Sequence, residues 1–233
     1  MIRTLPLALL ALAAALPAGA AERRHSVTDF DRVEVDGPYQ VTLRTGLVAG
    51  ARVEGSADAI ERVSIDVQGN RLRIRRSQNA WGGYPGDKTG PVKVSLTTRE
   101  LRAASVVGSG SLEVDRARGL RVDLSVSGSG RLAVAAVDTD NLVVGLIGGG
   151  RIALAGRTRQ LKATVQGSGD LAAAGLRAED ARITADTAGT VTVAVARAVT
   201  LKASGPGDVE IIGAPSCTVE GEPSGNVICG KAR

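Results

Sequence analysis

The residues of this sequence that could bind a ligand include a run of arginines. Arg71, Arg73 and Arg75 alternate with apolar residues, and Arg76 extends the run. Because side chains of a β-strand point alternately to its two faces, the three alternating arginines are expected to share one outward face. Guanidinium groups bind phosphate and sulfate through paired hydrogen bonds, so this patch could dock a cell-surface polymer. Charge runs are more often solvated strand faces, and both interpretations stay open.

A second candidate lies in the glycine- and proline-rich stretch from Ser77 to Pro91. It contains Trp81, the only tryptophan of the chain, and Tyr84, one of its two tyrosines. Exposed aromatic rings can stack on sugars or partners, and loops on rigid scaffolds often carry function. The alternative is that both rings pack over the flank of the fold and seal its core.

Residue combinations that would support catalysis are missing. The one histidine, His25, lies in a charged stretch near the N-terminus, so no Ser-His-Asp, Cys-His or histidine-metal arrangement is expected. The acidic residues are scattered, whereas polysaccharide-cleaving enzymes need acids that converge in one groove. We therefore predict no enzyme activity, no cofactor and no metal site. A polysaccharide-active enzyme is the alternative.

The two cysteines of the chain are predicted to form a disulfide. Cys217 stands six residues before Pro223, and Cys229 stands six residues after it. The alternation of the flanking residues turns both cysteines inward, on two strands of one coil. In an exported protein such a pair is expected to be oxidised, and it would fasten the C-terminal end. A redox pair would need C-x-x-C spacing, which is absent.

These residues are positioned by repeats that centre on glycine. Seven corners follow one another at intervals of 18 to 20 residues, and glycine fills the third position of each. These corner glycines are Gly110, Gly130, Gly150, Gly169, Gly189, Gly207 and Gly225. Apolar and polar residues alternate on both sides of each corner, which predicts strand, corner and strand with one buried face. The fold class is therefore all-β: a single-stranded parallel β-helix, or β-solenoid, with coils of about 18–20 residues and Gly-x-Gly corners.

Four segments follow from these patterns. Residues 1–20 have the charge, the short apolar run and the small-residue cleavage site of a signal peptide, cleaved near Ala20. Residues 21–27 are predicted to be a disordered linker. Residues 28–100 are predicted to form less regular coils with the Trp81/Tyr84 loop, and residues 101–230 to form regular coils that continue them as one domain. No later stretch is apolar enough to cross a membrane, so we expect a periplasmic or secreted protein.

The charge pattern argues against a nucleic-acid partner. The formal net charge is +5 at pH 7, from 29 basic and 24 acidic residues. Both signs are interspersed along the predicted strands, whereas nucleic-acid binders gather basic residues in one patch.

The combined N-terminal and repeat pattern resembles one known family. It comprises Phe30-x-x-Val33-x-Val35-x-Gly37-x-x-x-Val41-x-Leu43, the block from Val63 to Ile74, and the recurring Gly-Ser-Gly corners. This pattern is similar to the DUF2807 family, described as "putative auto-transporter adhesin, head GIN domain", across residues 28–230. The resemblance implies a right-handed β-helix in an exported protein, and it supplies no catalytic residues.

We therefore expect a non-catalytic binding or structural module of the cell envelope. Its partner would be a cell-surface glycan or an envelope protein. Self-association through the ends of the solenoid is a further hypothesis, because exposed strand edges can pair with another chain.

Overall fold

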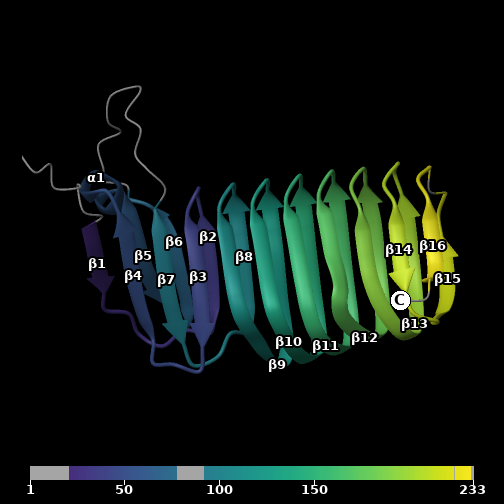
Figure 1. Ribbon diagram of the computed structural model, residues 1–233, viewed down its shortest axis with the longest axis horizontal. Coiled ribbons are helices and arrows are strands. Elements are labelled where there is room, and N and C mark those ends of the chain that lie inside the picture. The colour runs from purple at the N-terminus through teal and green to yellow at the C-terminus, as the bar shows by residue number, and fades with distance from the viewer. Residues whose placement is uncertain (1–20, 78–91, 223, 232–233) are drawn as a thin grey trace, which may run out of the picture.

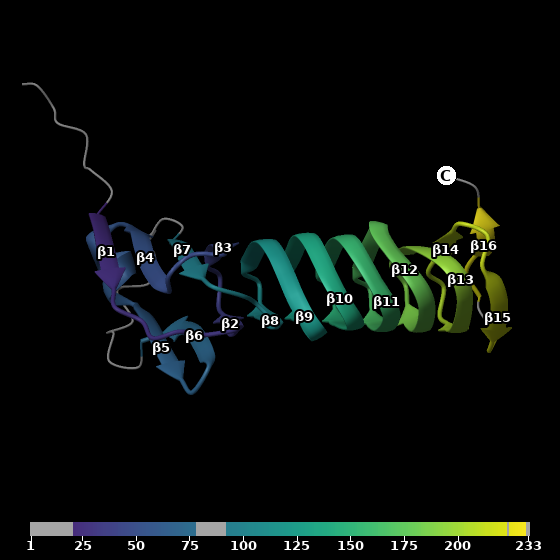
Figure 2. The ribbon, with the colours of Figure 1, turned by 90° about the horizontal axis from the view of Figure 1, so that it is seen from below.

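The computed structural model describes residues 21–77, 92–222 and 224–231, which form a β-solenoid (Figures 1 and 2). The predicted fold class is therefore confirmed. The predicted signal peptide, residues 1–20, and the Trp81/Tyr84 loop lie outside the described residues.

The N-terminal third consists of short elements. They are β1 (Ala21–His25), β2 (Arg32–Asp36), β3 (Gln40–Thr45), β4 (Gly50–Gly55), α1 (Ala57–Glu61), β5 (Val63–Gln68), β6 (Arg71–Arg76), β7 (Lys93–Thr98) and β8 (Ala103–Gly108). Long strands that bend around most of a coil follow. They are β9 (Ser111–Gly128), β10 (Arg131–Gly148), β11 (Arg151–Gly167), β12 (Asp170–Thr187) and β13 (Val191–Ser204). The last strands are β14 (Val209–Ile212), β15 (Ser216–Glu220) and β16 (Val227–Lys231).

Each long strand pairs in parallel with the equivalent strand of the next coil, which stacks like residues in columns. One inward column runs Leu112, Leu132, Ile152, Leu171 and Val191. All five are buried, with exposed fractions of 0–1%. The core is therefore a continuous stack of aliphatic side chains, and each coil buries its apolar face only against its neighbours.

The outward side chains form two sheet faces. We call face A the one made by the second half of each long strand, such as residues 121–128 of β9, joined by β5, β6, β2 and β8 at one end and by β15 at the other. Face B is made by the first half of each long strand, joined by β1, β4, β7 and β3 at one end and by β14 and β16 at the other. Side chains on either face therefore repeat at the strand spacing of about 4.8 Å.

The corner glycines are required by the close stacking of coils. A Cβ built on Gly150 would lie 2.6 Å from the carbonyl oxygen of Gly130, one coil earlier. Equivalent carbonyl contacts occur at all seven of the corner glycines. The first corner position has a different requirement, since Gly148 has a φ of +108° that other residues rarely adopt. Where a corner has glycine at both its first and its third position, the two glycines thus serve separate purposes.

The N-terminal end differs from the predicted parallel coils. β4 pairs antiparallel with β7, β1 pairs antiparallel with β4, and β5 pairs antiparallel with β6. Between them lies α1, whose Ala59 and Ile60 are buried in the core and whose Ser56 cap accepts a hydrogen bond from the Ala59 amide at 3.3 Å. A solenoid end would otherwise expose its core, so these non-repeating elements close it (Figure 1).

One predicted segment takes a different structure. Residues 21–27 were expected to be a disordered linker, but Ala21–His25 form β1. This strand completes its hydrogen bonds along β4, with Arg23 opposite Val53, and Ala21 packs against the core. Pairing with an edge strand stabilises even a charged segment, because the interaction is made by the backbone.

Candidate binding site

The predicted arginine patch lies on face A, at its N-terminal end, where it already has counter-ions. Arg73 lies 3.1 Å from a carboxylate oxygen of Glu34, and Arg71 lies 3.5 Å from the other oxygen. Arg75 lies 3.3 Å from Asp66. The three side chains do share one face, as predicted, but they contact carboxylates of β2 and β5. Their binding of a ligand stays a prediction, as does that of the exposed Arg76, and any ligand would have to compete with these acids.

The other predicted binding residues cannot be placed in the structure. Trp81 and Tyr84 lie outside the described residues. Among the residues that are described, no group of three His, Cys, Asp or Glu side chains could hold a metal ion. His25 is half-buried in β1, and burial together with the charge of Arg23 lowers its pKa.

A shallow groove of about 640 Å³ crosses face A farther along the solenoid. It runs over β9, β10, β11, β12 and β13, so its walls come from successive coils. Its polar lining residues are Arg121, Asn141, Gln160, Lys162, Asp180, Arg182 and Thr200. We call this the face A groove. It is built by the parallel register, because residues with the same offset from the corner are forced into adjacent positions.

Two acids on or beside the face A groove are already bound by arginines. Arg121 holds Asp123 with hydrogen bonds of 2.8 and 3.0 Å to one carboxylate oxygen. Arg197, at the following bend of the coil, donates to both oxygens of Asp180, with a distance of 2.8 Å from its Nε. This hydrogen bond holds the pKa of Asp180 below its ordinary value. Both acids therefore already have an arginine partner.

Two cations of the face A groove differ from its other charges. Lys162 on β11 and Arg182 on β12 occupy paired positions in adjacent coils, and both are exposed. Neither lies within ion-pair distance of a carboxylate in the part of the chain that the structure describes. Their column continues with the neutral Val143 on one side and Thr200 on the other. The groove thus holds two neighbouring positive charges without a counter-ion.

A second charged surface lies at the bend between the two faces, and its charges largely compensate one another. Arg157 binds Asp138 with an Nε–Oδ1 distance of 2.8 Å, and Arg118 lies 3.7 Å from the same carboxylate. Arg159 lies 3.6 Å from Asp140. Because these side chains reach between adjacent coils, this surface ties coils together, and most of its charges are already paired.

Face B carries a different hollow, of about 480 Å³, that is lined mainly by small apolar side chains. Alanines at 133, 135, 153, 155 and 172 form its floor, and the acidic Glu113 and Asp115 lie at its edge. Asp115 already accepts hydrogen bonds from the backbone amide and hydroxyl of Thr45, at 3.0 Å each. The other polar lining residues, Thr42, Arg44 and Glu113, lie on β3 and β9, whereas the lining from β10 to β12 is apolar.

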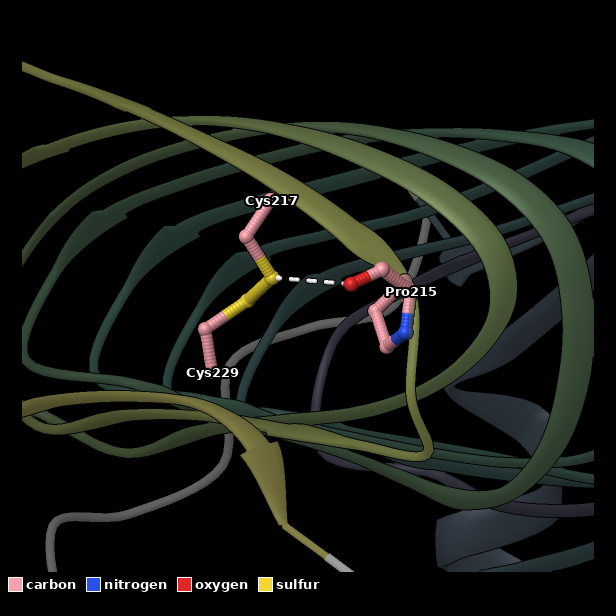
Figure 3. Close-up of a disulfide and its surroundings, with 3 residues drawn as sticks. All are labelled: Pro215, Cys217 and Cys229. Carbon is pink, nitrogen blue, oxygen red and sulfur yellow. Dashed lines mark hydrogen bonds between the residues drawn. A yellow bond between two sulfur atoms is a disulfide. The ribbon is translucent and has the colours of Figure 1, made fainter.

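The C-terminal end is fastened by a disulfide between Cys217 of β15 and Cys229 of β16 (Figure 3). Their Cα atoms lie 6.6 Å apart, and the bond spans the interior of the last coil. The pairing is the one predicted from the sequence. Cys229 packs against the core while Cys217 is exposed, so the bond joins the two strands where no further described coil stacks on them.

Sequence reasoning did not select Lys162 and Arg182, although a signal was present. Each stands five residues before the first position of its corner, Gly167 or Thr187, so the repeat itself places them side by side. Their lack of a counter-ion could not be predicted from the sequence, because it depends on which arginines contact Asp123 and Asp180 in the folded protein.

Comparisons with known proteins agree with the β-solenoid fold. A family model described as "Putative auto-transporter adhesin, head GIN domain" matches residues 29–215. Among solved structures, a "putative adhesin" from Bacteroides fragilis superposes with a TM-score of 0.83 at 16% identity, covering 93% of this chain and 98% of that one. A "putative lipid binding protein" from Parabacteroides distasonis gives 0.67 at 18% identity, with 92% and 98% covered.

A "putative adhesin" from Parabacteroides merdae gives a TM-score of 0.69 at 17% identity, with 93% of this chain and 97% of that one covered. At these identities the structural likeness concerns the fold alone. No curated protein sequence matches the chain. Within the described residues, no helix is long and apolar enough to span a membrane.

Proposed function

The chain belongs to the family described as "putative auto-transporter adhesin, head GIN domain", and on that premise we propose that it is an exported, non-catalytic binding module of the adhesin type. Its partner is a cell-surface glycan or an envelope protein. The ligand binds to outward side chains of the solenoid, which the stacked coils hold in fixed columns.

The observation that carries this proposal is the face A groove. It presents amide, hydroxyl and charged groups from five successive long strands on a rigid sheet, and these are the groups that bind sugar hydroxyls and acidic substituents. A glycan is favoured over a protein partner because seven of the twelve residues that line the groove are polar or charged, and such groups hydrogen-bond sugar hydroxyls and acidic substituents.

Export is supported by two features. Residues 1–20 have the pattern of a signal peptide, and the disulfide Cys217–Cys229 is of a kind that persists in oxidising compartments. We therefore place the mature chain in the periplasm or outside the cell.

The test is a binding screen of mature protein, residues 21–233, against a glycan array and envelope polysaccharides. Two variants are screened beside it: Trp81→Ala/Tyr84→Ala, and Arg71→Glu/Arg73→Glu/Arg75→Glu. Binding by the wild type to at least one polymer is the expected result. Loss of that binding in one variant, with its fold intact by circular dichroism, would place the site there and not in the face A groove. A wild type that binds no polymer would contradict the glycan proposal and direct the search to proteins.

A further inference from the structure

Lys162 and Arg182 form an unusual pair within the ion-paired surface of this solenoid. They lie opposite each other in adjacent parallel strands, about 4.8 Å apart by strand spacing. Like charges in directly opposite positions repel, and this repulsion is normally relieved by a carboxylate nearby. Elsewhere on the solenoid such relief is common, as at Arg151–Asp170, where two paired positions of β11 and β12 make an ion pair of 2.7 Å.

The nearest acids in the structure cannot supply this relief. Asp123 lies in the same column, but Val143 separates it from Lys162, and Arg121 holds it. Asp180 is two residues from Arg182 along β12, and Arg197 holds it. An external anion would therefore balance the positive charges of Lys162 and Arg182 in the face A groove.

We propose that the face A groove binds an acidic polysaccharide, whose carboxylate, sulfate or phosphate groups lie over Lys162 and Arg182. This inference rests on the proposed function and specifies its ligand. The arginine can bind such an oxyanion through two parallel hydrogen bonds, and the lysine adds a point charge beside it.

The rest of the groove suits a polymer better than a small anion. Asn141 and Gln160 present amides on one side of the cations, and Thr200 presents a hydroxyl on the other. These groups span β10 to β13, three strand spacings or about 14 Å along the solenoid axis. An extended chain that runs along this axis can contact all of them, whereas a single inorganic anion would reach only the two cations.

The predicted arginine patch of β6 provides a contrast on the same face. Arg71 and Arg73 equal Lys162 and Arg182 in number of charges, but both contact Glu34. An anion would have to displace that carboxylate, so the patch is expected to bind weakly. This makes it the matched control for the groove.

The experiment measures affinities of the mature protein for two matched pairs of polymers. They are polygalacturonate with its carboxyl-reduced form, and dextran sulfate with neutral dextran. The variant Lys162→Gln/Arg182→Gln is compared with the control Arg71→Gln/Arg73→Gln, which removes the same net charge from the same face. Circular dichroism and thermal melting establish that both variants fold.

We expect the wild type to bind at least one acidic polymer and to bind its neutral counterpart far more weakly. The groove variant should lose about tenfold or more in affinity, because charge-assisted hydrogen bonds are removed, while the control stays near the wild type. The exchanged variant Lys162→Arg/Arg182→Lys keeps both charges and should retain most of the affinity.

Three outcomes would overturn the inference. Equal binding of acidic and neutral polymers would leave the glycan-binding function standing but remove the role of the cations. Acidic binding that is lost in the control instead of the groove variant would move the site to β6. A wild type that binds neither acidic nor neutral polymers would overturn both this inference and the proposed glycan ligand, leaving a protein partner.

Discussion

Arg157 on β11 donates two hydrogen bonds to Asp138 on β10, with distances of 2.8 Å from Nε and 3.3 Å from Nη2. The two residues occupy paired positions of adjacent coils. Arg151 with Asp170 repeats this arrangement between the next two coils, and Arg197 reaches Asp180 from the position beside its register partner Ala198. Ion pairs thus follow the stacking of the coils, and their response to pH reports on that stacking.

Acid should destabilise the solenoid below about pH 5. Hydrogen bonds from arginine lower the pKa of Asp138, Asp170 and Asp180 in the folded state. The unfolded chain therefore binds more protons than the folded chain, so these groups stabilise the fold above their ordinary pKa of about 4, and this contribution is lost as the pH falls through the folded values. Melting curves from pH 7 to pH 2 should show a flat midpoint down to about pH 5 and then a fall.

The variant Asp138→Asn/Asp180→Asn tests the assignment of that effect. Its melting temperature should be lower than that of the wild type at pH 7, and it should fall less on acidification. A wild-type midpoint that is the same at pH 5 and pH 2 would contradict the interpretation.

Replacing a corner glycine should destabilise the fold because there is no room for a Cβ. In Gly150→Ala the new carbon would lie 2.6 Å from the carbonyl oxygen of Gly130 and 2.7 Å from a methyl carbon of Val126. We expect a loss of about 1–3 kcal/mol, the usual result of overpacking. Urea denaturation followed by circular dichroism measures it.

The neighbouring glycine is the control for this prediction. In Gly149→Ala the nearest atom would be the hydroxyl of Ser168 at 3.2 Å, which a side-chain rotation can move. The change should cost less than about 0.5 kcal/mol, as for most surface substitutions. Equal effects of the two substitutions would show that steric contact at the corner is not the cause.

Removing the disulfide should loosen the C-terminal end alone. Cys217 and Cys229 are separated by 12 residues, and closing a loop of this size contributes about 2–3 kcal/mol in the chain-entropy account. In Cys217→Ser/Cys229→Ser, amide hydrogen exchange of β15 and β16 should accelerate, while that of β9 to β11 should not change. Uniform acceleration along the solenoid would instead indicate that the bond stabilises all coils together.

Mild acid should weaken the docking of β1. Burial first, and then the charge of Arg23, lower the pKa of His25 in the folded state below 6.5. Arg24, Arg52 and Glu54 line the same hollow, and both arginines lie within ion-pair distance of Glu22. The stabilisation from neutral His25 is present above pH 6.5 and is lost as the pH falls from there through the folded value.

Hydrogen exchange of β1 at pH 7.5 and pH 5.5, corrected for intrinsic rates, measures this effect. Protection of β1 should fall at the lower pH in the wild type and stay nearly constant in His25→Asn. Unchanged wild-type protection would contradict the role of the histidine.

The repeating part of the fold could be predicted because its signals are local. Glycine at each corner indicates where the chain turns. Alternating apolar residues indicate which side chains face the core. β1 could not be found in this way, because its residues are mostly charged and its stability comes from backbone pairing with β4. The amino-acid composition of a segment does not show which strand its backbone will pair with.

Only part of the candidate site could be predicted from the sequence, for a similar reason. The outward position of Arg73 followed from alternation, but its contact with Glu34 joins residues 39 positions apart in the sequence. The free charges of Lys162 and Arg182 likewise depend on the contacts that occupy the surrounding acids. Charge compensation is a property of the folded surface and cannot be read from one strand.

The most direct test of the acidic-ligand account is a lysine footprint. The chain has few lysines, so acetylation of Lys162 on the face A groove can be compared by mass spectrometry with that of Lys93 on β7, which is also exposed. Saturating polygalacturonate or dextran sulfate should slow acetylation of Lys162 and leave Lys93 unchanged, and the neutral counterparts should affect neither. Equal rates at Lys162 with and without both acidic polymers would contradict the account.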